Sequence, residues 1–123
     1  MVHVQTKLNV IDNSGAKLAQ CIKILKNKRH ASIGDIIVVS IKDTYKNNQK
    51  SKVQKGDVSL ALVVRTKKPI IRKDGSSIKF DKNSVVLLHR NLQPVGTRIH
   101  GPLTHELRIL GFDKTISMAQ RIL

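Results

Sequence analysis

The chain has 123 residues, of which 40% are hydrophobic, so its apolar side chains suffice for one globular core and leave no room for two. Its 23 Lys and Arg against 8 Asp and Glu give a formal net charge of +15, which makes a polyanion the first partner to consider. The single cysteine, Cys21, excludes an internal disulfide and a zinc site built from several cysteines.

The first part of the chain has the pattern of a β-hairpin. Residues 4–11 alternate in polarity, with Leu8 and Val10 on one face, and turn formers follow at residues 12–15. Residues 18–25 predict the second strand. On that strand the side chains expected to point inward are Ile22 and Ile24, and those expected on the opposite face are Cys21 and Lys23.

Two nearly continuous apolar runs, at residues 36–41 and 60–64, predict further strands because they are short, β-branched and bounded by turn signals. Each run follows a Gly-Asp pair, at residues 34–35 and 56–57, which predicts two similar turns. A tight turn is also expected at residues 74–75, with short strands at residues 78–80 and 85–88.

Five or six short strands within about 90 residues predict a small closed β-barrel. One side of each middle strand would fill the barrel, and loops or partners would cover the other. In the last third we expect a short helix that Thr104 caps and Gly111 ends. The leucines expected to pack on the barrel are Leu103, Leu107 and Leu110, and the last buried stretch is expected at Ile116 and Met118.

The expected fold is therefore mainly β and forms a single domain over residues 1–123. The barrel and its basic loops would take up residues 1–90, and a C-terminal loop with short helices would take up residues 91–123.

Basic side chains gather in three predicted loops, at residues 26–30, 42–55 and 65–73. The last of these leaves a strand, so we expect a projecting hairpin. Three loops of one sign on a small barrel repel each other, and phosphates are the expected counter-charge. The alternative is a generic solvated, lysine-rich surface. A membrane surface is disfavoured because no amphipathic helix carries these charges.

RNA is favoured among the polyanions. Loops can follow phosphates and 2′-hydroxyls across the minor groove of A-form RNA, whereas no helix-turn-helix or zinc finger is visible. Aromatic residues are 2% of the chain, which argues against modules that stack single-stranded bases on rings. No apolar run approaches the about 18 residues of a membrane helix, and the first residues show no secretory signal, so we expect neither.

The sequence contains no recognisable arrangement of catalytic residues. We therefore expect a protein that is not an enzyme and uses no cofactor or metal. His100 and His105 stand near each other without a cysteine or paired carboxylates. Residues 96–101 carry glycines at both ends but lack the lysine of a phosphate-binding loop, so a structural turn is expected there. The rival from this class is a hydrolase that uses His100, His105 and Glu106.

Four segments, taken in order, resemble one known family over essentially the whole chain. They read QTKLNVIDNSGAK at residues 5–17, ALVV through DG, F, N and VL between residues 61 and 87, GTRIHGP at residues 96–102 and ELR at residues 106–108. The family is the universal ribosomal protein L14 family of the large ribosomal subunit. The resemblance implies a five-stranded β-barrel with a short helical C-terminal region that binds large-subunit rRNA.

The resemblance also implies partners. Members of the family pack beside the ribosomal proteins L3 and L19, contact small-subunit rRNA in bridges across the subunit interface, and dock a ribosome-silencing factor. From the residues alone, a free RNA-binding regulator or RNA chaperone is the alternative.

The same resemblance assigns site residues. Those expected against large-subunit rRNA are Lys17, Arg65, Thr66, Lys67 and Lys68. The basic character of the chain adds Lys23, Lys28, Arg29, Lys52, Lys55, Arg72 and Lys73. At the intersubunit or partner face we expect Lys46 and Lys50, together with Thr97, Arg98 and Lys114, which fall where the silencing factor docks.

The chain departs from the usual family pattern in ways that raise its charge. The loop at residues 26–33 looks shorter than usual and the loop at residues 43–53 looks longer. Lys82 replaces a usual acid, His100 a usual Phe and residues 120–121 a usual Pro-Glu. These changes resemble mitochondrial members, so a mitochondrial ribosome is expected, with a bacterial cytoplasm as the alternative.

Overall fold

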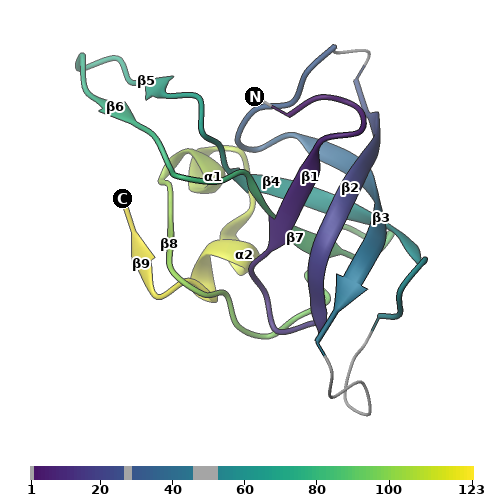
Figure 1. The fold of residues 1–123 in the computed structure, drawn as a ribbon. Helices are drawn as coiled ribbons and strands as arrows, with labels where there is room; N and C mark the ends of the chain where they lie inside the picture. The colour runs from purple at the N-terminus through teal and green to yellow at the C-terminus, as the bar shows by residue number, and fades with distance from the viewer. Residues whose placement is uncertain (1, 27–28, 46–52) are drawn as a thin grey trace.

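A closed β-barrel forms the body of the molecule, and the computed structural model describes residues 2–26, 29–45 and 53–123. Its strands, in order around the barrel, are β1 (Lys7–Val10), β2 (Ala16–Ile24), β3 (Ile36–Thr44), β4 (Val58–Arg65) and β7 (Ser84–Leu88) (Figure 1). Neighbouring strands are antiparallel, except that β1 and β7 pair in parallel and close the barrel. The predicted closed barrel is therefore confirmed, with five strands.

The apolar run of β4 lies between two hydrophobic cores. Ala61 and Val63 point into the barrel and belong to its interior core. Leu62 and Val64 point the other way and belong to a second core on the outside. This division confirms the expectation that one side of a middle strand fills the barrel while the other is covered.

The C-terminal third covers that outer face of β4 and β7. It contains β8 (Pro102–Leu103), α1 (Glu106–Ile109), α2 (Asp113–Ser117) and β9 (Arg121–Ile122) (Figure 1). Leu103, Leu107 and Ile116 are at most 3% exposed and pack in the outer core. The short helices therefore pack on the strands. The expected packing is confirmed for Leu103 and Leu107, two of the three predicted leucines.

The start of α1 and the exposure of Leu110 differ from the prediction. Leu110 is 56% exposed, and it follows Ile109, the last residue of this four-residue helix. The N-cap residue is His105 rather than Thr104, and its side chain makes no capping hydrogen bond. Gly111 ends the helix as predicted, with a φ of +92°.

The inward face of β2 was also predicted wrongly in part. Cys21 is buried, whereas Ile22 is 45% exposed. The pairing of β2 with β3 shifts its register between Cys21 and Lys23, and this bulge returns Ile24 to the inside. A strict alternation cannot show such a shift, because the bulge adds one residue to one strand only.

A hairpin at residues 65–80, called the basic hairpin below, projects from the end of β4 (Figure 1). It contains β5 (Ile70–Ile71) and β6 (Ser77–Ile78), which pair antiparallel. In its turn the amide and hydroxyl of Ser76 donate to Asp74 Oδ1 at 3.0 and 2.6 Å. The predicted hairpin and its turn are confirmed, although Phe80 lies beyond the short strand.

Candidate nucleic-acid interface

The base of the basic hairpin has a backbone fixed by hydrogen bonds. The Lys67 amide donates to Asn83 Oδ1 at 2.9 Å. Thr66 is 2% exposed, and its hydroxyl donates to the carbonyl oxygen of Lys68 at 2.9 Å. The carbonyl oxygen of Thr66 in turn accepts from the Phe80 amide at 3.0 Å. Thr66 therefore shapes the backbone from which the neighbouring lysines extend.

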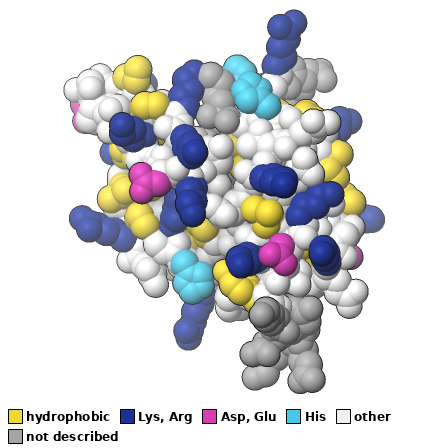
Figure 2. Space-filling model, in the orientation of Figure 1, with side chains coloured by type: hydrophobic (Ala, Val, Ile, Leu, Met, Phe, Trp, Pro, Cys, Tyr) yellow, Lys and Arg dark blue, Asp and Glu magenta, His cyan; other side chains and the backbone are white. Residues whose placement is uncertain are grey.

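Three lysines of the hairpin that were predicted to bind rRNA, Lys67, Lys68 and Lys73, are exposed to solvent. Lys79, which is also exposed, lies on the returning limb and was not predicted, because it falls outside the dense basic cluster in the sequence. Figure 2 shows Lys and Arg side chains spread over this face of the molecule, with few acidic ones among them. The hairpin thus presents several cations from a fixed scaffold.

Arg65 differs from these lysines because its guanidinium points into the protein. Its Nε donates to the carbonyl oxygen of Pro102 at 3.0 Å, and another guanidinium nitrogen donates to the carbonyl oxygen of His100. The Phe80 ring lies 5.7 Å from the guanidinium carbon, and burial lowers the pKa of Arg65. Gly101 has a φ of +84°, and a Cβ there would overlap the guanidinium. Arg65 therefore holds the C-terminal segment against β4.

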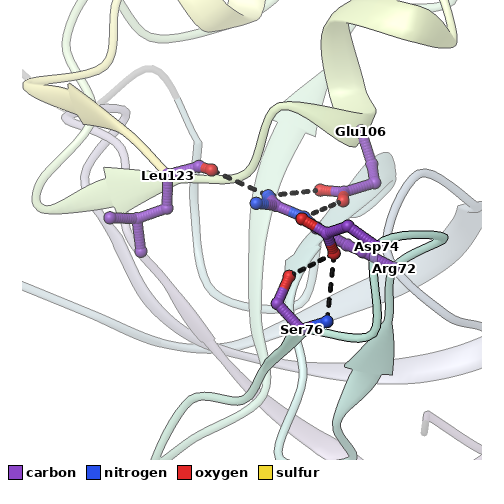
Figure 3. A network of polar contacts seen from close by, with 5 residues as sticks. All are labelled: Arg72, Asp74, Ser76, Glu106 and Leu123. Atoms are coloured by element: carbon purple, nitrogen blue, oxygen red, sulfur yellow. Dashed lines mark hydrogen bonds and ion pairs between the residues drawn. The ribbon is translucent and has the colours of Figure 1, made fainter.

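Arg72 is also engaged within the chain. Its Nε donates to Glu106 Oε1 at 2.7 Å, and a second nitrogen donates to Oε2 at 3.3 Å and to the carbonyl oxygen of Leu123 at 2.7 Å (Figure 3). These contacts tie the hairpin to α1. The hydrogen bond raises the pKa of Arg72 and lowers the pKa of Glu106. The link therefore contributes to stability above the ordinary Glu106 pKa of 4.5 and is lost as the pH falls through the lowered value.

Several acidic side chains stabilise backbone turns. Asp35 accepts from the Ser32 amide and Asp57 from the Gln54 amide, each at 2.9 Å, which confirms that the two Gly-Asp turns are alike. Asp12 is buried, and burial raises its pKa although the hydrogen bonds it accepts lower it. Those bonds come from the Ser14 amide and hydroxyl at 3.2 and 2.5 Å and from the Leu87 amide at 3.1 Å. These acids therefore stabilise turns through backbone amides and a hydroxyl.

A second basic region lies near the start of β2. There Asn13 fixes the loop that carries Thr97 and Arg98. The Asn13 Oδ1 accepts from the Thr97 amide at 2.7 Å and from the Arg98 amide at 3.1 Å. Its Nδ2 donates to the Thr97 hydroxyl at 2.8 Å. The Ile99 amide donates to the carbonyl oxygen of Met118 at 3.3 Å, which brings α2 to the same region. Residues 96–101 form a braced loop, and Arg98 is exposed on it.

Among the described residues, those predicted to bind rRNA or partners fall toward the two ends of the barrel. Lys23, at the end of β2, lies on the same end as the basic hairpin, and Arg29 lies in the loop that leads to β3. Lys17, near the start of β2, and Lys55, in the loop before β4, lie toward the end with Arg98. Lys114 is the second residue of α2. Four predicted residues lie outside the described part of the chain: Lys28, Lys46, Lys50 and Lys52.

Two features of this surface were missed by the sequence analysis. Asn13 was read only as a turn former, and nothing local to it shows that its amide would hold a loop 84 residues further along. The pairing of Arg72 with Glu106 spans 34 residues, so charge clustering alone did not separate this arginine from its exposed neighbours.

Within the described ranges, no helix has the length and apolar character needed to cross a bilayer. The described side chains also contain no group of three or more His, Cys, Asp or Glu placed to hold a metal ion. Glu106, one of the residues of the rival hydrolase, has its carboxylate engaged by Arg72.

A comparison with known protein families identifies the family of this chain. The sequence model of the family described as ribosomal protein L14p/L23e matches residues 1–123, the whole chain. Proteins of this family are structural constituents of a ribosomal subunit and are generally not enzymes. The barrel, the projecting basic hairpin and the full-length match therefore lead to one conclusion: this chain belongs to the ribosomal protein L14p/L23e family and is a structural constituent located on the ribosome.

Proposed function

We propose that the chain binds large-subunit rRNA through the basic hairpin and the loops beside it. The observation that carries this proposal is the group of exposed lysines Lys67, Lys68 and Lys73 on a backbone fixed by Thr66 and Asn83. A fixed scaffold loses little conformational entropy when its cations meet phosphates. The whole chain, residues 1–123, would act as one domain in this role.

In the proposed mechanism, the lysines neutralise rRNA phosphates at positions that the shape of the RNA sets. Packed RNA helices repel each other through their phosphates, and lysines inserted between them release counterions and lower that repulsion. Loops of this kind can follow phosphates and 2′-hydroxyls across a minor groove. Because the chain has a net charge of +15, the phosphates also reduce the repulsion among its own cations.

The end of the barrel with Thr97, Arg98 and Lys114 would face the small subunit. The loop there is held by Asn13, so it presents Arg98 in a defined position. We infer that it contacts small-subunit rRNA and serves as the docking face of a ribosome-silencing factor. The protein neighbours would be those that resemble ribosomal proteins L3 and L19.

Arg98→Glu tests this assignment. The variant should enter large subunits normally but weaken subunit joining, because it places a negative charge opposite small-subunit phosphates. The Asn13 contacts use the backbone of Arg98, so the loop should keep its shape. Sucrose gradients would show fewer monosomes at unchanged levels of large subunits, and an unchanged monosome yield would contradict the interface assignment.

A free RNA-binding regulator or RNA chaperone is the competing function, and stoichiometry separates the two. A ribosomal constituent should be present at one copy per large subunit and should resist moderate salt washes. Quantitative mass spectrometry of washed large subunits measures this. A substoichiometric protein that washes off would favour the regulator.

The compartment of this ribosome is inferred from the departures that raise the charge, at Lys82, His100 and residues 120–121. We infer a mitochondrial ribosome, with a bacterial one as the alternative. Copurification with mitochondrial or with cytoplasmic ribosomes decides between the two.

A further inference from the structure

The outer part of the basic hairpin, residues 69–79, is tied to the rest of the molecule by a single polar side chain. Between described residues, the hydrogen bonds that leave this segment all come from Arg72. Its other hydrogen bonds close its own turn. Ile70 packs against the outer core, whereas Ile71 is 80% exposed. Arg72 and Ile70 therefore hold the direction in which the hairpin projects (Figure 1).

Both partners of Arg72 are fixed to the body of the molecule. Glu106 is the first residue of α1, and the next residue, Leu107, is buried in the outer core. Leu123 carries the other acceptor, and its amide donates to the carbonyl oxygen of Leu103 at 2.7 Å. The guanidinium thus bridges two anchored groups (Figure 3). Because its donors form a rigid planar fork, these bonds fix orientation as well as distance.

The pair of Arg72 and Glu106 is partly shielded from solvent, since the two side chains are 27% and 26% exposed. A fully exposed ion pair contributes little, because solvent screens it and two long side chains must be ordered to form it. Here shielding reduces the screening, and the additional bond to Leu123 orders the guanidinium. The contact is therefore suited to holding the outer part of the hairpin.

Glu106 is an acid among the cations of the candidate interface. It lines the same groove as Lys68, one of the lysines proposed to bind rRNA. By electrostatics alone, removing this carboxylate should strengthen RNA binding, because it repels phosphates and neutralises Arg72. A role in holding the hairpin has the opposite consequence, because the outer part and Lys73 with it would then move. The sign of the change in affinity separates the two roles.

We propose that Glu106 is a positioning residue for rRNA binding: through Arg72 it holds the outer part of the basic hairpin, and Lys73 with it, in the orientation that meets the RNA. The inference rests on the proposed function and adds to it a residue that does not itself touch RNA. A hairpin that is already held loses less conformational entropy on binding than one that moves.

Glu106→Ala tests this role by the affinity for rRNA. The probe is the shortest fragment of large-subunit rRNA that the unmodified chain protects from nuclease, measured by fluorescence anisotropy at one salt concentration. The variant should bind it about fivefold more weakly, although the net charge of the chain rises by one. The matched control is Asp113→Ala, since Asp113 is exposed and is the first residue of α2. The control makes the same change in charge and should bind as tightly as the unmodified chain or slightly more tightly.

A double-mutant cycle with Arg72→Ala shows whether the effect passes through Arg72. That variant already frees the hairpin, so adding Glu106→Ala should cause no further loss of affinity. Relaxation of ¹⁵N nuclei gives a second readout that a general loss of stability would not produce. In Glu106→Ala the order parameters should fall over residues 69–79 and stay unchanged in the barrel strands. Glu106→Gln keeps one acceptor oxygen, so its affinity should lie between those of Glu106→Ala and the unmodified chain.

The inference would be overturned if Glu106→Ala bound rRNA as tightly as Asp113→Ala. An equal loss with and without Arg72, or a loss with unchanged order parameters over residues 69–79, would also overturn it. Were Glu106→Ala unfolded, Glu106→Gln would decide by the same comparisons. An unmodified chain that protects no rRNA would contradict the proposed function and this inference with it. A chain that binds rRNA equally well without the Glu106 carboxylate would contradict the positioning role alone.

Discussion

Changing Lys67, Lys68 and Lys73 together to glutamate is expected to abolish incorporation of the chain into large subunits while the barrel stays folded. The three side chains are exposed, and the substitution replaces attraction to phosphates with repulsion at each position. Each lost phosphate contact lowers the slope of log affinity against log salt by about 1, so the slope for an rRNA fragment should fall by about 3. Sucrose-gradient cosedimentation and a salt titration measure the two effects.

Arg65 and Arg72 are left unchanged in that variant because their guanidinium groups hold other parts of the chain. A matched control reverses three exposed cations outside the basic loops and the predicted sites, Lys7, Arg90 and Arg121. The control should retain much more incorporation than the hairpin variant. Equal losses would mean that only total charge counts, and the hairpin would have no special role.

Arg65→Ala is expected to destabilise the chain by about 3 kcal/mol, although the arginine belongs to the basic segment predicted to bind RNA. Its hydrogen bonds to the carbonyl oxygens of His100 and Pro102 are charge-assisted and partly buried, and nothing replaces them. Arg65→Lys should recover little, because an ammonium lacks the planar fork that reaches both carbonyls. Urea unfolding followed by circular dichroism gives the free energy of unfolding for each variant.

Lys67→Ala is the control for this experiment, since it lies two residues away and is exposed. Its free energy of unfolding should stay within about 0.5 kcal/mol of the unmodified chain. Were Arg65→Ala as stable as this control, the contacts to the C-terminal segment would contribute nothing. A loss of rRNA binding by a fully stable Arg65→Ala would instead support the predicted RNA role of this residue.

The barrel could be predicted because its signals are local. Alternating or continuous apolar runs and the turn chemistry of residues 12–15 and 74–75 each act within a few residues of the chain. The continuous run of β4 was correctly taken as a strand covered on both sides. The bulge at Cys21 was not predictable, because it depends on how β2 pairs with β3 rather than on either sequence alone.

The candidate interface could be predicted only in part, for a related reason. Clusters of Lys and Arg show where charge gathers, but they do not show which guanidinium turns inward. Arg72 pairs with Glu106, which lies 34 residues along the chain. Arg65 donates to carbonyl oxygens 35 and 37 residues along the chain. Lysines between these arginines remain on the surface, as predicted.

The most direct test of the account is a cryo-electron microscopy map of the large subunit that contains this chain. The ammonium groups of Lys67, Lys68 and Lys73 should lie within hydrogen-bonding distance of rRNA phosphates or ribose hydroxyls, while Arg65 keeps its contacts with His100 and Pro102. A map in which these lysines extend into bulk solvent, with no nucleotide near the hairpin, would contradict the central claim that the basic hairpin binds rRNA.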